Sequence, residues 1–421
     1  MKPKKQKQQL FMKKRNSNYK GTFFITGLRI DTEEFEIGIL RNNLAVTFGV
    51  VSEGFKVEEK HALIQSLLKK LSDEKQKGKV INVSPGICMR INFKGLDGDQ
   101  LVQPVFSEFR LKEHWENCTW GNLLLDNASL EDEVYITNPS KPLWHTLPLN
   151  KDAYISYLYE IAPVILPFLH DRLLTVIRYP HGVDGESFYQ KSCPDYAPAF
   201  IQSQVTENIN YILCNNLSTL LWLGNQLALE FHVPFETTKS KNPMEIVFDL
   251  DPPSKDHFPL AVKAALEMQK LFTKFEIKSY PKLSGNKGLQ IHIPVMDRSF
   301  SYLDSRVFTE FIARYLVEKF PKDFTIERMK KNRGEKLYID YLQHWEGKTI
   351  ICPYSARGKE LPTIAAPLLW EEINENLDPA LYTIPYVKER VEEMGCPFLD
   401  NGYFSEENIS LKSIIATLQK S

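Results

Sequence analysis

The order of hydrophobic and polar positions changes character along the chain. Residues 21–110 contain short apolar runs rich in Val, Ile and Phe, which are typical of β-strands. We expect hairpin turns at residues 41–43 and 96–98, and one helix over residues 56–75, where leucines recur at helical spacing. This order predicts a small closed β-barrel of the OB type, whose closure leaves no exposed sheet edge.

From about residue 131 onward, helical and strand-like runs alternate. Helices are expected over residues 152–172, ending near Pro167, over 218–232, capped by Ser218 or Thr219, and over 258–275. Strands are expected over residues 173–180, 244–253, 288–295 and 335–342. The expected fold class is α+β, an OB-type barrel followed by a mixed α/β domain.

The expected domain borders follow these patterns. A basic tail spans 1–20, the barrel 21–111, a linker 112–130 and the second domain 131–421. The tail carries eight Lys or Arg and no acid, so it is either a disordered solubilising segment or an arm that touches phosphates.

Composition narrows the class of protein. The 421 residues are 43% hydrophobic and 25% charged, which excludes collagen-like, coiled-coil and wholly disordered chains. With 52 basic and 53 acidic residues, any nucleic-acid surface must be local. No apolar run approaches the roughly 18 residues of a membrane helix. The six cysteines form no C-x-x-C pair, so we expect reduced thiols in a cytoplasmic protein.

Three acids lie in strand-like apolar surroundings. Asp249 and Asp251 are two residues apart, which places both carboxylates on one strand face. A solvated strand end would also explain this pair. Asp340 is a further single acid in an apolar run, and three such acids on neighbouring strands would bind divalent cations for phosphoryl or nucleotidyl transfer.

Residues 284–288, Ser-Gly-Asn-Lys-Gly, lie between two strand-like runs. The two glycines of this loop let backbone N–H groups curl around an anion, while Ser284 and Lys287 add a hydroxyl and a positive charge. The spacing is not that of a Walker A loop, and a plain turn is the alternative. Arg357, 17 residues after Asp340, is expected to provide a fork for a triphosphate.

Phe188 and Tyr189 are adjacent aromatics flanked by Arg178 and Lys191. Such an arrangement is typical of platforms that stack nucleic-acid bases beside phosphate contacts. A buried core pair explains the pattern equally well.

With these residues in view, the chain from about Val134 to about Ile415 resembles the polymerase module of bacterial DNA ligase D, in the archaeo-eukaryotic primase superfamily. The resemblance rests on several motifs in the family's order. They lie at residues 137–141 (TNPSK), 178–182 (RYPHG), 188–191 (FYQK), 221–234 (LWLGNQLALEFHVP), 248–253 (FDLDPP), 284–289 (SGNKGL) and 340–357 (DYLQ to PYSAR).

The resemblance implies a role for each matching position. The catalytic residues Asp249, Asp251 and Asp340 would hold two Mn²⁺ or Mg²⁺ ions per site. The nucleoside triphosphate would contact Ser284, Lys287, Arg357 and His232. DNA would contact Arg178, Phe188, Tyr189, where the family more often has Phe, and Lys191. A pocket for the 5′-phosphate at a break would comprise Asn138, Lys141 and Lys151.

One position departs from the family pattern, in which a histidine usually follows the loop at position 290. Here the residue is Gln290, with His292 on the same strand face as a partial substitute for nucleotide binding. Gln can donate a hydrogen bond but cannot carry a proton, so triphosphate affinity and rate are the properties we expect to differ.

Residues 21–111 resemble the OB domain of the ligase module in the same family. The adenylation domain with its K-x-D-G motif is absent, because the nearest string, at residues 94–98, is one residue too long. Without a lysine nucleophile, no ligase activity is expected of this chain.

Together the residues and the resemblance imply a bacterial repair polymerase for nonhomologous end joining. It would add nucleotides, preferably ribonucleotides, to 3′ ends at gaps and double-strand breaks. Its expected partners are DNA ends, gapped duplex, nucleoside triphosphates, Ku and a separate ligase, at the nucleoid and not at a membrane. The alternatives are a catalytically decayed scaffold that only binds DNA ends and a primase that starts chains de novo.

Overall fold

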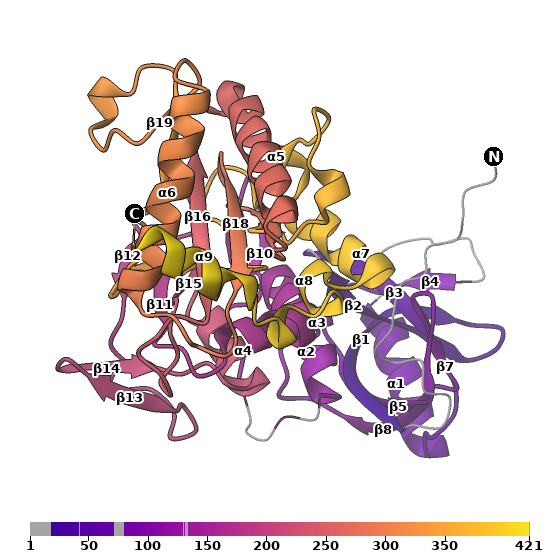
Figure 1. The fold of residues 1–421 in the computed structure, drawn as a ribbon. Coiled ribbons are helices and arrows are strands. Elements are labelled where there is room, and N and C mark those ends of the chain that lie inside the picture. The colour runs from indigo at the N-terminus through magenta and orange to yellow at the C-terminus, as the bar shows by residue number, and fades with distance from the viewer. Residues whose placement is uncertain (1–17, 42, 71–79, 129, 131–133, 421) are drawn as a thin grey trace. The chain divides into compact units, whose positions relative to one another are not determined.

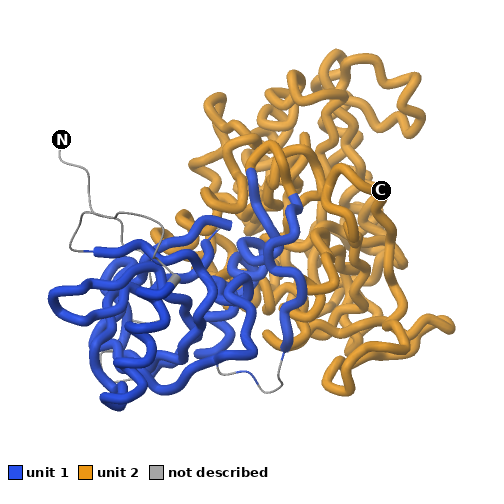
Figure 2. Tube along the Cα trace, turned by 180° about the vertical axis from the view of Figure 1, so that it is seen from behind, with its two compact units in different colours: residues 1–143, 148–159 blue, residues 144–147, 160–421 orange. Residues whose placement is uncertain are grey.

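The computed structural model describes residues 18–41, 43–70, 80–128, 130 and 134–420 (Figure 1). Most of the expected basic tail therefore lies outside the described residues. The chain forms two compact units, coloured separately in Figure 2: residues 1–143 with 148–159, and residues 144–147 with 160–421. The division falls within helix α3 (Lys151–Leu169).

The first unit contains the expected barrel. Its main sheet has the order β3-β2-β1-β5-β8, and β4 pairs with β1. A bridge between Glu53 and Val105 joins the chain after β3 to the start of β8, and the Phe106 N–H donates to the Glu53 carbonyl at 2.8 Å, which closes the sheet. The strands are β1 (Tyr19–Arg29), β2 (Glu34–Arg41), β3 (Leu44–Val51), β4 (Val80–Asn82), β5 (Cys88–Phe93) and β8 (Val105–Phe109).

Both expected turns are present in this unit. Arg41 pairs with Leu44 across the first, where Asn43 has φ 63°, and Gly98 with φ 63° lies between β6 (Gly95–Asp97) and β7 (Gln100–Val102). Helix α1 (Val57–Lys70) matches the helix expected there up to the limit of the described residues.

The segment expected to be a linker, residues 112–130, is structured. It forms the 3-10 helix η1 (Trp115–Asn117) and helix α2 (Trp120–Asp126). Trp120, Leu123 and Leu124 are buried in the barrel's core, so apolar burial outweighs the polar residues that interrupt the pattern.

The second unit is built around two sheets, which confirms the α+β class. A four-stranded sheet has the order β12-β11-β15-β21, and a five-stranded sheet has the order β17-β18-β16-β20-β19, antiparallel except for β19 and β20. The strands are β11 (Thr175–Arg178), β12 (Phe188–Gln190), β15 (Ala228–Pro234), β16 (Glu245–Asp251), β17 (Tyr280–Leu283), β18 (Leu289–Pro294), β19 (Phe324–Thr325), β20 (Leu337–Asp340) and β21 (Thr349–Ile351).

Helices α5 (Phe258–Lys274) and α6 (Tyr302–Lys319) lie against the five-stranded sheet (Figure 1). The Phe248 ring of β16 packs against Phe272 of α5 and Phe308 of α6, at centroid distances of 6.0 and 6.1 Å. Since side chains alternate along a strand, Asp249 and Asp251 project from the opposite face.

Helix α3 ends at Leu169, near Pro167 as expected. It includes Pro167 because Ile165, Phe168 and Leu169 are buried and their packing outweighs the missing backbone donor.

Helix α4 (Leu217–Asn225) is capped by Asn216, whose side chain accepts from the Thr219 N–H, rather than by Ser218 or Thr219. It ends before Leu227, whose φ of 63° is incompatible with a helix, and the residues that follow form β15.

The remaining strands and α-helices lie outside the two main sheets. They are β9 (Pro142–Trp144), β10 (Leu149–Asn150), β13 (Ser203–Thr206), β14 (Ile209–Ile212), α7 (Ile384–Met394), α8 (Pro397–Asp400) and α9 (Ser410–Leu418). All six cysteines are free thiols. Among the residues described, none of the helices is both long and apolar enough to cross a membrane.

Candidate functional site

The register of the five-stranded sheet brings two of the three acids together. Asp249 of β16 pairs directly with Asp340 of β20 on one side and with Gln290 of β18 on the other. Burial, together with the nearby negative charges of Asp340 and Asp251, raises the pKa of Asp249 to about 6, against a hydrogen bond from Gln290 that lowers it. The three carboxylates therefore form one crowded negative patch.

Each carboxylate also has partners in the protein. Oδ1 of Asp340 accepts from the Tyr338 hydroxyl at 3.1 Å and from the backbone N–H groups of residues 342 and 343. Asp251 lies 3.0 Å from Lys287 Nζ and 3.5 Å from Arg333 Nη1. The positive charges of Lys287 and Arg333 therefore offset part of the negative charge of the Asp251 carboxylate.

The donor chemistry suits hard divalent cations. Within the described residues, Oδ2 of Asp249 and Oδ2 of Asp340 accept no hydrogen bond, so each acid has one oxygen available as a ligand. In the same part of the chain, no three His, Cys, Asp or Glu side chains converge closely enough to hold an ion. The acids thus match a metal site in donor chemistry and charge.

The loop of residues 284–288 lies against β16 and the segment that contains Arg357. Ser284 Oγ accepts from the backbone N–H groups of Asn286 and Gly288, at 3.3 and 3.1 Å. Gly285 has φ 71°, and a Cβ there would lie 2.9 Å from Arg357 Cγ, so only glycine allows this approach. A cavity of about 520 Å³ borders the loop, lined in part by Asn286 and Lys287.

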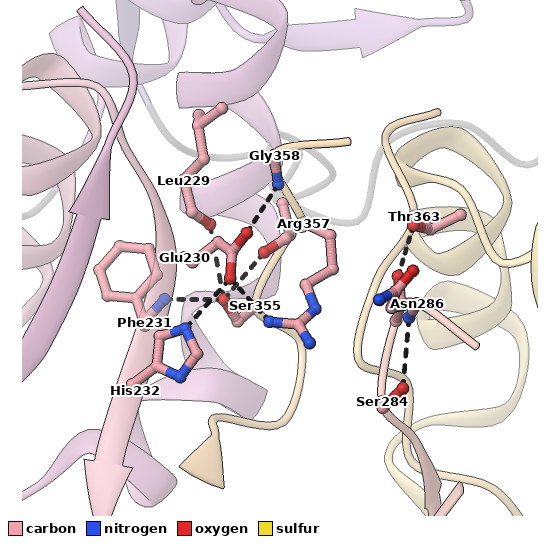
Figure 3. Close-up of polar contacts among 12 residues, drawn as sticks. Leu229, Glu230, Phe231, His232, Ser284, Asn286, Ser355, Arg357, Gly358 and Thr363 are labelled. Atoms are coloured by element: carbon pink, nitrogen blue, oxygen red, sulfur yellow. Dashed lines mark hydrogen bonds and ion pairs between the residues drawn. The ribbon is translucent and has the colours of Figure 1, made fainter. Parts of the chain in front are cut away.

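A buried glutamate, Glu230, contacts the segment that contains Arg357 (Figure 3). Glu230 of β15 binds Arg357 Nη1 at 2.7 Å and His232 Nε2 at 3.1 Å, and it accepts from the Gly358 N–H and the Tyr179 hydroxyl. Burial alone would raise the pKa of Glu230, but the hydrogen bond with His232 and the charge of Arg357 lower it to about 2. Glu230 is thus an anion that fixes both expected nucleotide contacts.

Gln290 lies between a lysine and an acid. Its Nε2 donates to Asp249 Oδ1 at 3.1 Å, and its Oε1 accepts from Lys282 Nζ at 2.5 Å. The expected substitute His292 has other partners. Its Nδ1 hydrogen-bonds with Glu245 at 2.6 Å, beside Tyr403, so these contacts do not join it to the acids.

The adjacent aromatics are on the surface, which excludes the core pair. Phe188 is 44% exposed and Tyr189 73%. The Arg178 guanidinium lies 5.3 Å from the Phe188 ring centroid and also donates to the hydroxyl of Tyr196, itself 62% exposed. Lys191 is exposed immediately after β12. Two exposed aromatics, Phe188 and Tyr196, thus contact the Arg178 guanidinium, and Tyr189 lies next to Phe188 in the chain.

In the first unit, the three residues expected to bind a 5′-phosphate lie together. Lys151 Nζ donates to the Thr137 carbonyl at 2.6 Å, its backbone N–H to the Lys141 carbonyl, and the Lys141 N–H to the Asn138 carbonyl. Burial, together with the charge of Lys141, lowers the pKa of Lys151 to about 8.

Comparison with known proteins identifies the family. The model of the LigD primase-polymerase domain matches residues 150–398, more than half of the chain. The chain belongs to the LigD primase-polymerase family. It is 44% identical to the bifunctional non-homologous end joining protein LigD of Bacillus subtilis over 404 residues, 96% of this chain and 66% of that protein.

A multifunctional LigD of Mycolicibacterium smegmatis is 33% identical over 63% of this chain and 35% of its own length. The chain therefore spans less than two thirds of each relative. A solved polymerase domain of Mycobacterium tuberculosis ligase D, in complex with DNA, matches at a TM-score of 0.59 and 29% identity, covering 64% of this chain and 98% of that one.

Sequence reasoning missed four residues that contact the candidate site residues of this LigD-family chain: Glu230, Lys282, Arg333 and Tyr196. Glu230 carried a usable signal, a single acid in an apolar strand, which is the same signal that singled out Asp340. The other three carried none, because their roles depend on partners between 8 and 82 residues away in the chain.

Proposed function

We propose that this LigD-family chain is a metal-dependent nucleotidyltransferase that extends 3′ ends at DNA gaps and breaks during nonhomologous end joining. The observation that carries the proposal is the direct pairing of Asp249 with Asp340, beside the 284–288 loop and the Glu230–Arg357 pair. This is the arrangement that nucleotidyl transfer needs, an acidic ion site next to groups that bind phosphates.

In this proposal the primer's 3′-hydroxyl attacks the α-phosphate of a bound nucleotide, and pyrophosphate leaves. Two divalent cations, Mn²⁺ or Mg²⁺, held by Asp249, Asp251 and Asp340, would lower the hydroxyl's pKa and offset charge on the phosphates. Arg357 and Lys287 would bind the phosphate oxygens, Ser284 would donate a hydrogen bond, and His232 would orient the nucleotide. Most of the rate would come from positioning and charge neutralisation.

DNA would bind at two places that the contacts support. The exposed aromatics around Arg178 would stack on bases, and the two lysines near residue 138 would hold the 5′-phosphate of the downstream strand. A relative of known structure was solved with DNA. The same proposal includes a preference for ribonucleotides and a cytoplasmic location at the nucleoid. It also includes Ku and a separate ligase as partners, since no ligase activity is expected of this chain.

The deciding experiment uses the whole chain, Mn²⁺, labelled nucleotide and a gapped duplex with a 5′-phosphate. We expect nucleotides to be incorporated into the gap, opposite the template strand, with ribonucleotides favoured over deoxyribonucleotides. Binding of the duplex without incorporation would instead show a DNA-end scaffold. Products made on template without primer would show a primase.

The buried lysine of the phosphate pocket predicts a pH dependence. Lys151 loses its charge as pH rises through its pKa of about 8, whereas the phosphate stays a dianion above pH 7. The preference for 5′-phosphate over 5′-hydroxyl duplex should therefore fall about tenfold between pH 7 and pH 9. Fluorescence anisotropy with both duplexes measures it.

The variant Lys151→Met provides the control. It should show a weak preference at every pH, because no ammonium is left to titrate. A preference that stays constant from pH 7 to pH 9 in the unmodified protein would contradict this role for Lys151.

A further inference from the structure

The buried position of Lys282 is energetically unfavourable for a charged side chain. Lys282 of β17 is 0% exposed, and an ammonium is rarely buried without a compensating partner. Lys282 pairs with Gln290 in the sheet, and Gln290 pairs with Asp249. The three side chains therefore form a row on one sheet face, with the acid at its end.

The hydrogen bonds along this row fix the direction of the amide. The Lys282 ammonium donates to Gln290 Oε1 at 2.5 Å, and Gln290 Nε2 donates to Asp249 Oδ1 at 3.1 Å. With the amide turned over, its N–H groups would face the ammonium and its oxygen would face the carboxylate. Both contacts would then be repulsive, so Lys282 selects the orientation that donates to the acid.

We infer that Lys282 is a positioning residue that acts through Gln290 to hold Oδ1 of Asp249 and leave Oδ2 for a divalent cation. The inference rests on the proposed function, because it assigns Lys282 to the metal site of that reaction. Lys282 itself would touch neither cation nor substrate, because its side chain is fully buried. The only other hydrogen bond of its side chain among the described residues is to the carbonyl of Leu283, at 3.3 Å.

This row also explains how glutamine can replace the histidine usual at position 290. A neutral imidazole has one acceptor and one donor nitrogen, the same pair that the amide presents to Lys282 and Asp249. The requirement at this position is thus an acceptor toward the lysine and a donor toward the acid. Proton transfer is not part of that requirement.

The test is a double-mutant cycle with Lys282→Met and Gln290→Leu, read out as Mn²⁺ affinity by calorimetry without nucleotide or DNA. Burial, with the charge of Arg357, lowers the pKa of Lys282 to about 7, so the titration is run at pH 6, where the ammonium that selects the amide orientation is present. Each single variant should bind Mn²⁺ about five- to tenfold more weakly, and the double variant no more weakly than the weaker single variant.

A conservative variant and a control complete the design. Gln290→His should keep Mn²⁺ affinity within about twofold, since it restores both hydrogen bonds. Lys274→Met, an exposed lysine on α5, should change nothing. If Lys282→Met does not fold, as judged by thermal unfolding, the contrast between Gln290→Leu and Gln290→His still tests the donor to Asp249.

The outcomes separate this inference from the proposed function. Additive losses in the cycle, or Mn²⁺ affinity unchanged in both single variants, would overturn the positioning role even if the protein extends primers. A non-additive cycle in a protein that incorporates no nucleotide would support the role and refute the polymerase. Absence of Mn²⁺ binding to the unmodified protein would overturn the inference as well.

Discussion

Replacing Asp249 or Asp340 by asparagine should abolish primer extension, with a loss of at least about 10³-fold in rate. The two acids pair directly in the sheet, and each offers one oxygen that no other described group uses. Asparagine keeps the shape and an acceptor oxygen for the existing donors but removes the negative charge that a divalent cation requires. Single-turnover extension with labelled nucleotide and Mn²⁺ measures the loss.

Folding should not suffer in these variants. Asp249 is destabilised by burial and by its two acidic neighbours, so neutralising one of the three acids removes repulsion. The unfolding temperature without metal should therefore stay the same or rise. Asp256→Asn, an exposed acid five residues after Asp251, is the matched control and should extend primers normally. Undiminished extension by both site variants would refute the assignment of the acids.

Local patterns carry much of the fold, and the errors have physical causes. Short apolar runs rich in Val, Ile and Phe predicted the barrel strands and β16, because a strand that is buried on both faces for much of its length has such a run. The helix expected over residues 218–232 fails halfway, where Leu227 adopts φ 63° and the next residues pair with β11 and β21. Long-range pairing decides that boundary, and no local pattern reports it.

The site shows the same division. The spacing of Asp249 and Asp251, and the apolar setting of Asp340, were enough to single out the three acids, and the register places Asp249 opposite Asp340 on neighbouring strands. The partners of these groups were not predictable. Lys282 and Glu230 act through side chains of other strands, so their roles follow only from the sheet order.

Replacing Glu230 by glutamine should lower kcat/KM for the nucleotide about 100-fold, mainly through KM, because Arg357 loses its anchor. Glutamine can still accept from the Gly358 N–H but cannot pair with the guanidinium. The pKa of Glu230, lowered to about 2, keeps it ionised at every assay pH, so the variant removes a full charge. Steady-state extension at varied nucleotide concentration separates KM from kcat.

The same change should destabilise the fold, which gives a second, independent measurement. Since Glu230 has a lower pKa folded than unfolded, its contribution to stability is present above its ordinary pKa of 4.5 and is lost as pH falls toward 2. At pH 7.5 the variant should lose about 2–3 kcal/mol of unfolding free energy, and the difference from the unmodified protein should shrink as pH falls below 4.5. Glu389→Gln, an exposed change on α7, should alter neither quantity. An unchanged KM with reduced stability would show that Glu230 stabilises the fold but does not position Arg357 for nucleotide binding.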